Sequence, residues 1–126
     1  MGRKNSPSAN KELNELIAQY ETARAENRQL YLDGDQLADI ADQYAAGRKF
    51  NEAQEVITYG LHLHPDSTDL LVEQAYLYLD TGKIPLAKKV VESITDEYDT
   101  DVKMLKAELM LNEGQLENAR NVLDTI

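Results

Sequence analysis

The chain has 126 residues, no cysteine and a formal net charge of −10, which is the size of one domain and too small for an αβ barrel. Its single phenylalanine and lack of tryptophan leave Leu, Ile, Val, Ala and Tyr to form the core, which favours packed helices. The negative charge repels phosphate backbones and anionic lipids, so we expect neither nucleic acid nor a membrane as partner. Without cysteine there is no disulfide framework and no thiolate zinc site.

The first ten residues, MGRKNSPSAN, are polar and show no apolar periodicity. They lack the apolar stretch of a secretory signal, and no later apolar run approaches the length of a membrane span. We therefore expect residues 1–10 to be a disordered tail or a remnant of cloning. The chain is expected to be soluble and cytoplasmic.

A helix is predicted from about Lys11 to Leu30, inside an N-terminal capping segment that covers residues 11–32. Its apolar stripe consists of Leu13, Leu16, Ile17 and Tyr20. We expect the stripe to cover apolar surface of the next element, and the alternative is a partner-binding amphipathic helix. Asp33-Gly34-Asp35 then turns the chain, with Asp35 predicted as the N-cap of the following helix. As calcium ligands these acids would lack the rest of the loop pattern and its closing Glu.

An internal repeat occupies residues 33–126. One set of four positions recurs 34 residues later, and again 32 residues after that. The sets are Ala41, Tyr44, Ala53 and Ile57; Ala75, Tyr78, Ala87 and Val91; and Ala107, Met110, Ala119 and Leu123. Two residues have been lost between the second and third units. The expected bounds of the three units are 34–67, 68–99 and 100–126.

Each unit divides into two helical stretches with a short break. The breaks GRKF, GKI and GQL begin at Gly47, Gly82 and Gly114, and they predict tight helix hairpins. Small alanines at matching places on both helices allow the close approach that so short a turn requires. Pro85 fits as an early helical residue, where its missing N–H breaks no intrahelical bond.

The stretch GLHLHPD at residues 60–66 has two interpretations: a metal-binding strand end of a hydrolase, or the polar end of a helix. Residues two apart on a helix point about 200° apart, so His62 and His64 cannot chelate one ion from one face. A protonated imidazole near a helix C-terminus is stabilised by the helix dipole, and Pro65 ends the helix. With only two histidines in the chain, we expect no metal site.

The remaining polar clusters also have structural explanations. The acidic run Asp96, Glu97, Asp99 and Asp101 is expected to supply solvated acids and an N-cap, rather than a cation site. No Ser-His-Asp arrangement and no glycine-rich phosphate loop is found, so we expect neither an enzyme nor a cofactor.

The first unit reads Leu37-x2-Ile40-Ala41-x2-Tyr44, then Ala53-x3-Ile57, then Pro65. This spacing resembles the tetratricopeptide repeat, a 34-residue helix-turn-helix unit, and the resemblance covers residues 34–126. The third unit departs from the pattern at Lys103 and Lys106, where apolar residues are expected. Asp99 stands where the family has Pro, and the two-residue deletion leaves the angle between the second and third units open.

The resemblance implies an all-α, right-handed α-solenoid whose first helices line a concave groove, with the extra N-terminal helix in front. The groove residues it implies are Ala38, Asp42, Ala45, Val72, Tyr76, Leu79, Met104, Glu108 and Leu111, preceded by Asp35, Asp69 and Asp101. The Lys and Asn residues by which some chaperone-binding relatives clamp a carboxylate do not occur at these places, so that function is not implied.

We therefore expect a non-enzymatic scaffold whose groove binds an apolar, basic peptide or helix. The alternative is a self-association or structural module, the leading piece of a longer repeat protein. In that case chains would meet through the groove or the C-terminal hairpin, whose last helix has the apolar residues Leu116, Val122, Leu123 and Ile126.

Overall fold

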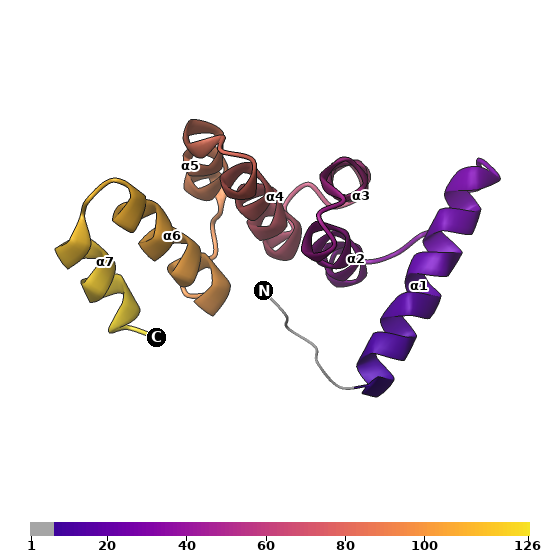
Figure 1. Ribbon diagram of the computed structural model, residues 1–126, viewed down its shortest axis with the longest axis horizontal. Coiled ribbons are helices and arrows are strands. Elements are labelled where there is room, and N and C mark those ends of the chain that lie inside the picture. The colour runs from indigo at the N-terminus through magenta and orange to yellow at the C-terminus, as the bar shows by residue number, and fades with distance from the viewer. Residues whose placement is uncertain (1–6) are drawn as a thin grey trace. The chain divides into compact units, whose positions relative to one another are not determined.

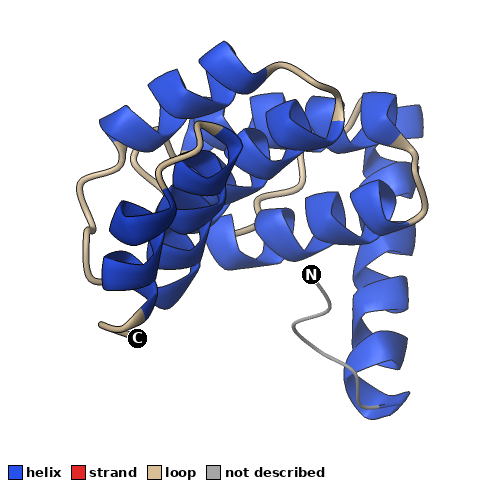
Figure 2. Cartoon of the chain, turned by 60° about the vertical axis from the view of Figure 1, so that its left-hand side comes forward, coloured by secondary structure: helices blue, strands red, loops and turns tan. Residues whose placement is uncertain are grey.

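The computed structural model describes residues 7–126 and contains α-helices, turns and loops over that range, without strands (Figure 2). The helices are α1 (Pro7–Ala25), α2 (Gly34–Ala46), α3 (Phe50–Leu63), α4 (Thr68–Asp80), α5 (Ile84–Ser93), α6 (Thr100–Asn112) and α7 (Leu116–Leu123). The expected all-α class is confirmed. The chain forms two compact units, with α1 to α3 in unit 1, which ends at Pro65, and α4 to α7 in unit 2.

In unit 1, α2 and α3 form an antiparallel hairpin, as Figure 1 shows. Leu37, Ile40 and Ala41 from α2 and Ala53 and Ile57 from α3 are each at most 1% exposed. The alanines lie fully inside because the short turn brings the two helices close together. The apolar periodicity of the first unit therefore predicted its core.

The N-cap of α2 is Asp33 and not Asp35, which corrects the sequence prediction. The backbone N–H of Gln36 donates to Asp33 Oδ1 at 2.9 Å, and the N–H of Asp33 donates to Gln36 Oε1 at 3.1 Å. This reciprocal capping box satisfies two backbone donors at once, whereas Asp35 lies in the first turn of the helix.

The hairpin turns place one residue of each unit in the left-handed backbone region. Gly82 and Gly114 have φ values of 76° and 77°, and Arg48 has 60°. Arg48 precedes Gly82 by 34 residues in the repeat, so Gly47 is not the equivalent of these glycines. Gly47 has an ordinary φ of −84°, and the first unit carries the strained conformation on a residue with a side chain.

The N-terminal helix begins earlier and ends earlier than predicted. Residues 1–6 of the expected tail lie outside the described part of the chain, whereas residues 7–10 belong to α1. The helix ends at Ala25 because Asn27 adopts a positive φ of 52° and Arg28 N–H donates to the carbonyl of Ala23 at 2.8 Å. This closing pattern stops the helix five residues before the predicted Leu30.

The last turns of α1 pack on the α2–α3 hairpin of unit 1. Tyr20 and Ala23 are buried there, and the Tyr44 hydroxyl donates to Glu21 Oε2 at 2.5 Å. Burial, together with this hydrogen bond, raises the pKa of the Tyr44 phenol above its ordinary value. The hydrogen bond therefore fastens α1 to α2 through an uncharged phenol.

In unit 2, α4 and α5 form one hairpin and α6 and α7 another. Their core cluster contains Ala75, Ala87, Val91, Leu105 and Leu109, and each of these is at most 5% exposed. A second cluster joins three buried residues of α4, the segment after α5, and α6: Val72, Ile94 and Val102. The two hairpins of this unit thus share buried apolar contacts through α4, α5 and α6.

The two-residue loss shortens the second helix of its repeat. Helix α5 has 10 residues, whereas the equivalent α3 has 14. It begins with Pro85 in its first turn, as predicted, and ends at Ser93, after which Ile94 is extended. Asp99 then caps α6 by accepting the Val102 N–H at 3.1 Å, which confirms the N-cap expected in the acidic run.

Candidate functional site

Five of the expected groove residues lie together on α4 and α6 of unit 2. Tyr76, Leu79, Met104, Glu108 and Leu111 are called the α4–α6 strip below. Helix α6 buries Val102, Leu105 and Leu109, so the i, i+4, i+7 series from residue 104 to residue 111 points away from the core. Met104 is 40% exposed and Leu111 is 48% exposed.

The α4 side of the strip is anchored in the core. Tyr76 packs against both apolar clusters of unit 2, and Leu79 packs against the cluster around Ala75. Both side chains are half-buried. The strip therefore combines two fixed side chains on α4 with two exposed and more flexible ones on α6.

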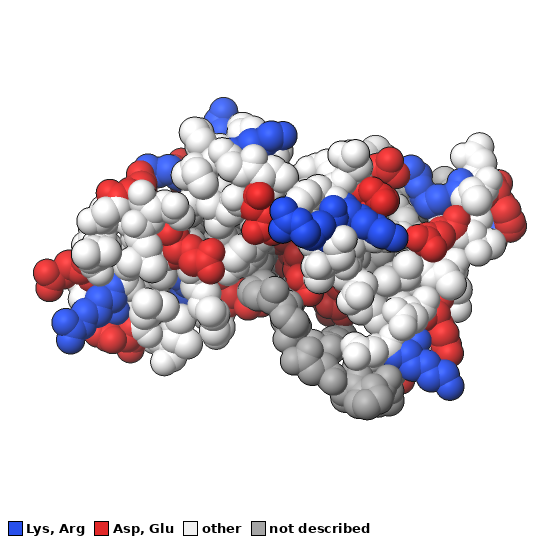
Figure 3. All heavy atoms as spheres, viewed as in Figure 1, with Lys and Arg blue, Asp and Glu red and all other residues white. Residues whose placement is uncertain are grey.

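The polar edge of the strip is acidic. Burial, and then the negative charge of Asp80 at the end of α4, raises the pKa of the Glu108 carboxyl. Two carboxylates near an apolar strip disfavour each other's charged form, and a cation between them would relieve this repulsion. Acidic side chains are also visible on much of the face drawn in Figure 3, in keeping with the net charge of −10.

Two expected groove residues are core residues, which corrects the implied set. Val72 is 1% exposed because it faces the cluster of Ile94 and Val102, and Ala38 is also 1% exposed. Neither offers surface to a partner. Asp42 and Ala45 on α2 are half-buried in unit 1, and the structure brings the strip together from unit 2 alone.

A comparison with protein-family models matches residues 44–109, more than half of the chain, to the tetratricopeptide repeat. The chain belongs to the tetratricopeptide repeat family. Comparisons with curated proteins and with solved structures returned no significant match. Tetratricopeptide repeats generally mediate protein–protein interactions and are typically non-catalytic modules. The family assignment places the α4–α6 strip on first helices of the second and third repeats.

The histidines of this tetratricopeptide repeat protein lie at the end of α3, as predicted, but one has a more specific contact than the helix dipole. His64 Nε2 lies 2.8 Å from the carbonyl oxygen of Leu32, and the ring meets Tyr31 edge-on with centroids 5.5 Å apart. His64 therefore holds the segment between α1 and α2 against α3. His62 is exposed in the last turn of α3.

Two further searches were limited to residues 7–126. Over that range, no group of three or more His, Cys, Asp and Glu side chains is arranged to hold a metal ion. No helix in the same range is long and apolar enough to cross a membrane.

One polar cavity was missed by the sequence analysis. It lies in unit 1 at the end of α1 and is lined by Tyr20, Ala23, Arg24, Asn27, Arg28, Gln29, Leu30 and Tyr59. A signal was present in the sequence, since Arg24 and Arg28 stand four residues apart in an acidic chain. The helix was predicted to continue to Leu30, which hid the turn that forms the cavity.

Proposed function

We propose that this chain is a non-enzymatic protein-interaction scaffold that binds an apolar, basic helix or extended peptide on the α4–α6 strip. The observation that carries the proposal is the pair of exposed large apolar side chains, Met104 and Leu111, beside two acids on a family scaffold for protein binding. The right-handed stacking of the hairpins, which the family implies, belongs to the same proposal.

The chemistry of the partner follows from the strip. Apolar side chains of the partner would remove Met104 and Leu111 from water, at about 25 cal/mol for each Å² of apolar surface buried. A lysine or arginine would lie near Glu108 and Asp80, whose mutual repulsion it reduces. Nucleic acid and anionic lipid do not supply such a cation, and we propose a protein partner in place of either.

The test uses two designed peptides as probes. One is an amphipathic helix of leucine and lysine, and the other has glutamate in place of every lysine. Calorimetric titration is expected to show binding of the lysine peptide and not of the glutamate peptide. The variant Glu108→Gln is expected to weaken binding of the lysine peptide, because it removes one of the facing charges.

Matched variants distinguish the strip from apolar surface in general. Leu111→Ser and Leu86→Ser make the same change at residues that are 48% and 44% exposed, on α6 and α5 respectively. We expect about a tenfold weaker affinity for Leu111→Ser and unchanged affinity for Leu86→Ser. Equal loss in both variants, or equal binding of both peptides, would refute the proposed site.

Self-association is the second candidate, and a separate surface favours it. Leu116, Leu123 and Ile126, at the C-terminal end of unit 2, are 67%, 44% and 56% exposed. Leu116 and Leu123 are seven residues apart on α7 and so share one face. Under this proposal, sedimentation of the parent shows dimers that disappear in a Leu116→Lys, Leu123→Glu variant. A parent that stays monomeric at millimolar concentration would contradict it.

A further inference from the structure

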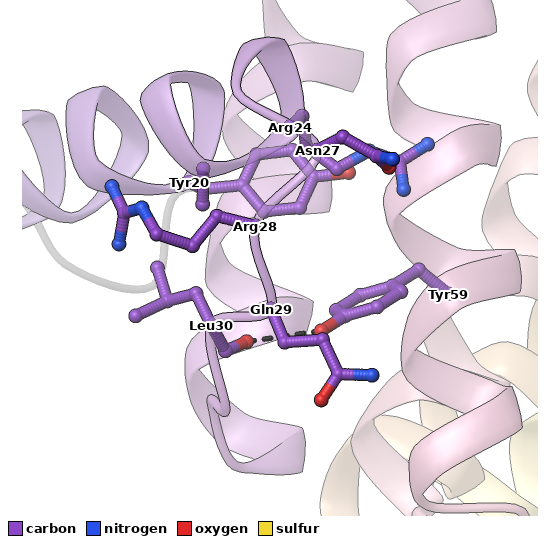
Figure 4. Close-up of a pocket in the computed structure, with 8 residues that line it drawn as sticks. Tyr20, Arg24, Asn27, Arg28, Gln29, Leu30 and Tyr59 are labelled. Carbon is purple, nitrogen blue, oxygen red and sulfur yellow. Dashed lines mark hydrogen bonds between the residues drawn. The ribbon is translucent and has the colours of Figure 1, made fainter.

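The polar cavity at the end of α1, called the corner cavity below, lies within unit 1 and apart from the α4–α6 strip. Its volume is about 110 Å³. A cavity needs only about 10–15 Å³ by this kind of measure to hold one water molecule, so the space suits a polyatomic group. Figure 4 shows the lining side chains around the rings of Tyr20 and Tyr59.

The walls of the corner cavity are held by backbone hydrogen bonds. Asn27 turns the chain in the left-handed conformation, and its N–H donates to the Arg24 carbonyl at 3.2 Å. The Tyr59 hydroxyl donates to the carbonyl oxygen of Leu30 at 3.0 Å, drawn as the dashed line in Figure 4. The segment between α1 and α2 is thereby fastened to α3, and the cavity exists without a ligand to form it.

The charge of the lining is positive in a protein that is strongly negative. Arg24 and Arg28 line the cavity, and no acidic side chain does. Arg24 lies over the Tyr59 ring, 5.7 Å from its centroid, and Arg28 pairs at 3.6 Å with the exposed Glu26. The C-terminus of a helix carries only about half a negative charge, which two guanidinium groups exceed.

One buried donor inside the cavity wall has no partner. The Tyr20 hydroxyl is buried and forms no hydrogen bond within residues 7–126, and the residue as a whole is 5% exposed. Burial raises the pKa of this phenol, so it keeps its proton and remains a donor at neutral pH. A buried hydroxyl without an acceptor is unfavourable, and a bound oxygen atom would satisfy it.

We propose that the corner cavity binds a small oxyanion, a carboxylate or phosphate group, which accepts a hydrogen bond from Tyr20 and lies against the guanidinium of Arg24. Charge-assisted hydrogen bonds of this kind are shorter and stronger than neutral ones. Figure 4 shows the guanidinium groups of Arg24 and Arg28 on opposite sides of the Tyr20 ring. Arg24 therefore supplies the direct contact, and Arg28 adds positive charge at longer range.

Titration of the full chain with sodium phosphate and with sodium acetate, at constant ionic strength in chloride, tests the proposal. Backbone amide NMR signals of residues 23–30 are expected to shift and to saturate with at least one of the two anions. Saturation with phosphate alone indicates a site for a tetrahedral group, and saturation with acetate alone indicates one for a planar group. If neither anion gives saturable shifts, the cavity holds water only and the proposal is refuted.

Three variants assign the residues. Arg24→Gln and Tyr20→Phe are each expected to weaken anion binding about tenfold, because each removes one group that contacts the oxyanion. The control is Arg48→Gln, since Arg48 also stacks on a ring, 5.2 Å from the Phe50 centroid, but does not line the cavity. Well-dispersed amide spectra verify that each variant is folded. Equal weakening by the control and by Arg24→Gln would show a general charge effect and overturn the assignment.

Discussion

Ala75 on α4 provides the most direct test of the repeat register, through the substitution Ala75→Leu. Ala75 is completely buried in unit 2, in the cluster that contains Ala87, Val91, Leu105 and Leu109. Leucine adds three carbon atoms at a close helix crossing, where Ala87 and Leu105 are also 0% exposed. The added apolar surface would be favourable if it fitted, but overpacking of a close-packed core typically costs about 1–3 kcal/mol, and we expect the cost to dominate.

Urea and thermal unfolding followed by circular dichroism measure the effect. For a domain of this size, a loss of about 1–3 kcal/mol lowers Tm by roughly 5–15 °C. Since stacked repeats need not unfold in one step, hydrogen exchange at Leu109 and Ile57 reports on unit 2 and unit 1 separately. We expect lost protection at Leu109 in unit 2.

The control is Ala18→Leu, at an exposed position of α1, which should change stability by less than about 0.5 kcal/mol. The reasoning is refuted if the Ala75→Leu variant melts at or above the parent temperature. It is also refuted if the two leucine variants behave alike.

Three further predictions concern single residues. Gly82→Ala should cost about 1 kcal/mol in urea unfolding, because its φ is 76° with open space around the new Cβ, while Gly47→Ala should be neutral or mildly stabilising. The raised pKa of Tyr44 means that the folded state holds this proton more tightly than the unfolded state. Its contribution is therefore present below pH 10 and is lost as the pH rises further, so the parent should lose stability there more steeply than Tyr44→Phe. Zinc titration should give the same weak response in the parent and in a His62→Ala, His64→Ala variant; micromolar binding confined to the parent would contradict the helix-end interpretation.

The repeat, the hairpins and the small residues at the helix crossings were predictable from the sequence, because each depends on local periodicity. Ala41, Ala75 and Ala107 recur at the repeat spacing, and all three are buried at 2% or less. A period of 3.6 residues fixes which face of a helix is apolar, and a 34-residue recurrence fixes how the faces pair. The family match over residues 44–109 rests on the same pattern.

The caps and turns show where local patterns were insufficient. Asp33 and Asp35 are equally good N-cap residues by type, and the helix start is decided by the reciprocal bonds between Asp33 and Gln36. Gly47 looked like the turn glycine of the first unit, but Arg48 occupies the left-handed position. Boundaries of this kind depend on a few hydrogen bonds and backbone angles that periodicity does not encode.

Tertiary structure alone decided which surfaces are available to a ligand. Val72 occupies a groove position in the repeat pattern, yet it is buried because the segment around Ile94 and Val102 packs on it. The corner cavity arises because α1 ends at Ala25 and Tyr59 holds the next segment on α3, which brings Tyr20 beside residues of α3 that are distant in sequence. The sequence by itself determined the helices and their apolar faces, since these follow from the spacing of neighbours along the chain. The exposure of a side chain and the partner of a buried hydroxyl depend on residues brought together by packing, and only the folded chain contains that information.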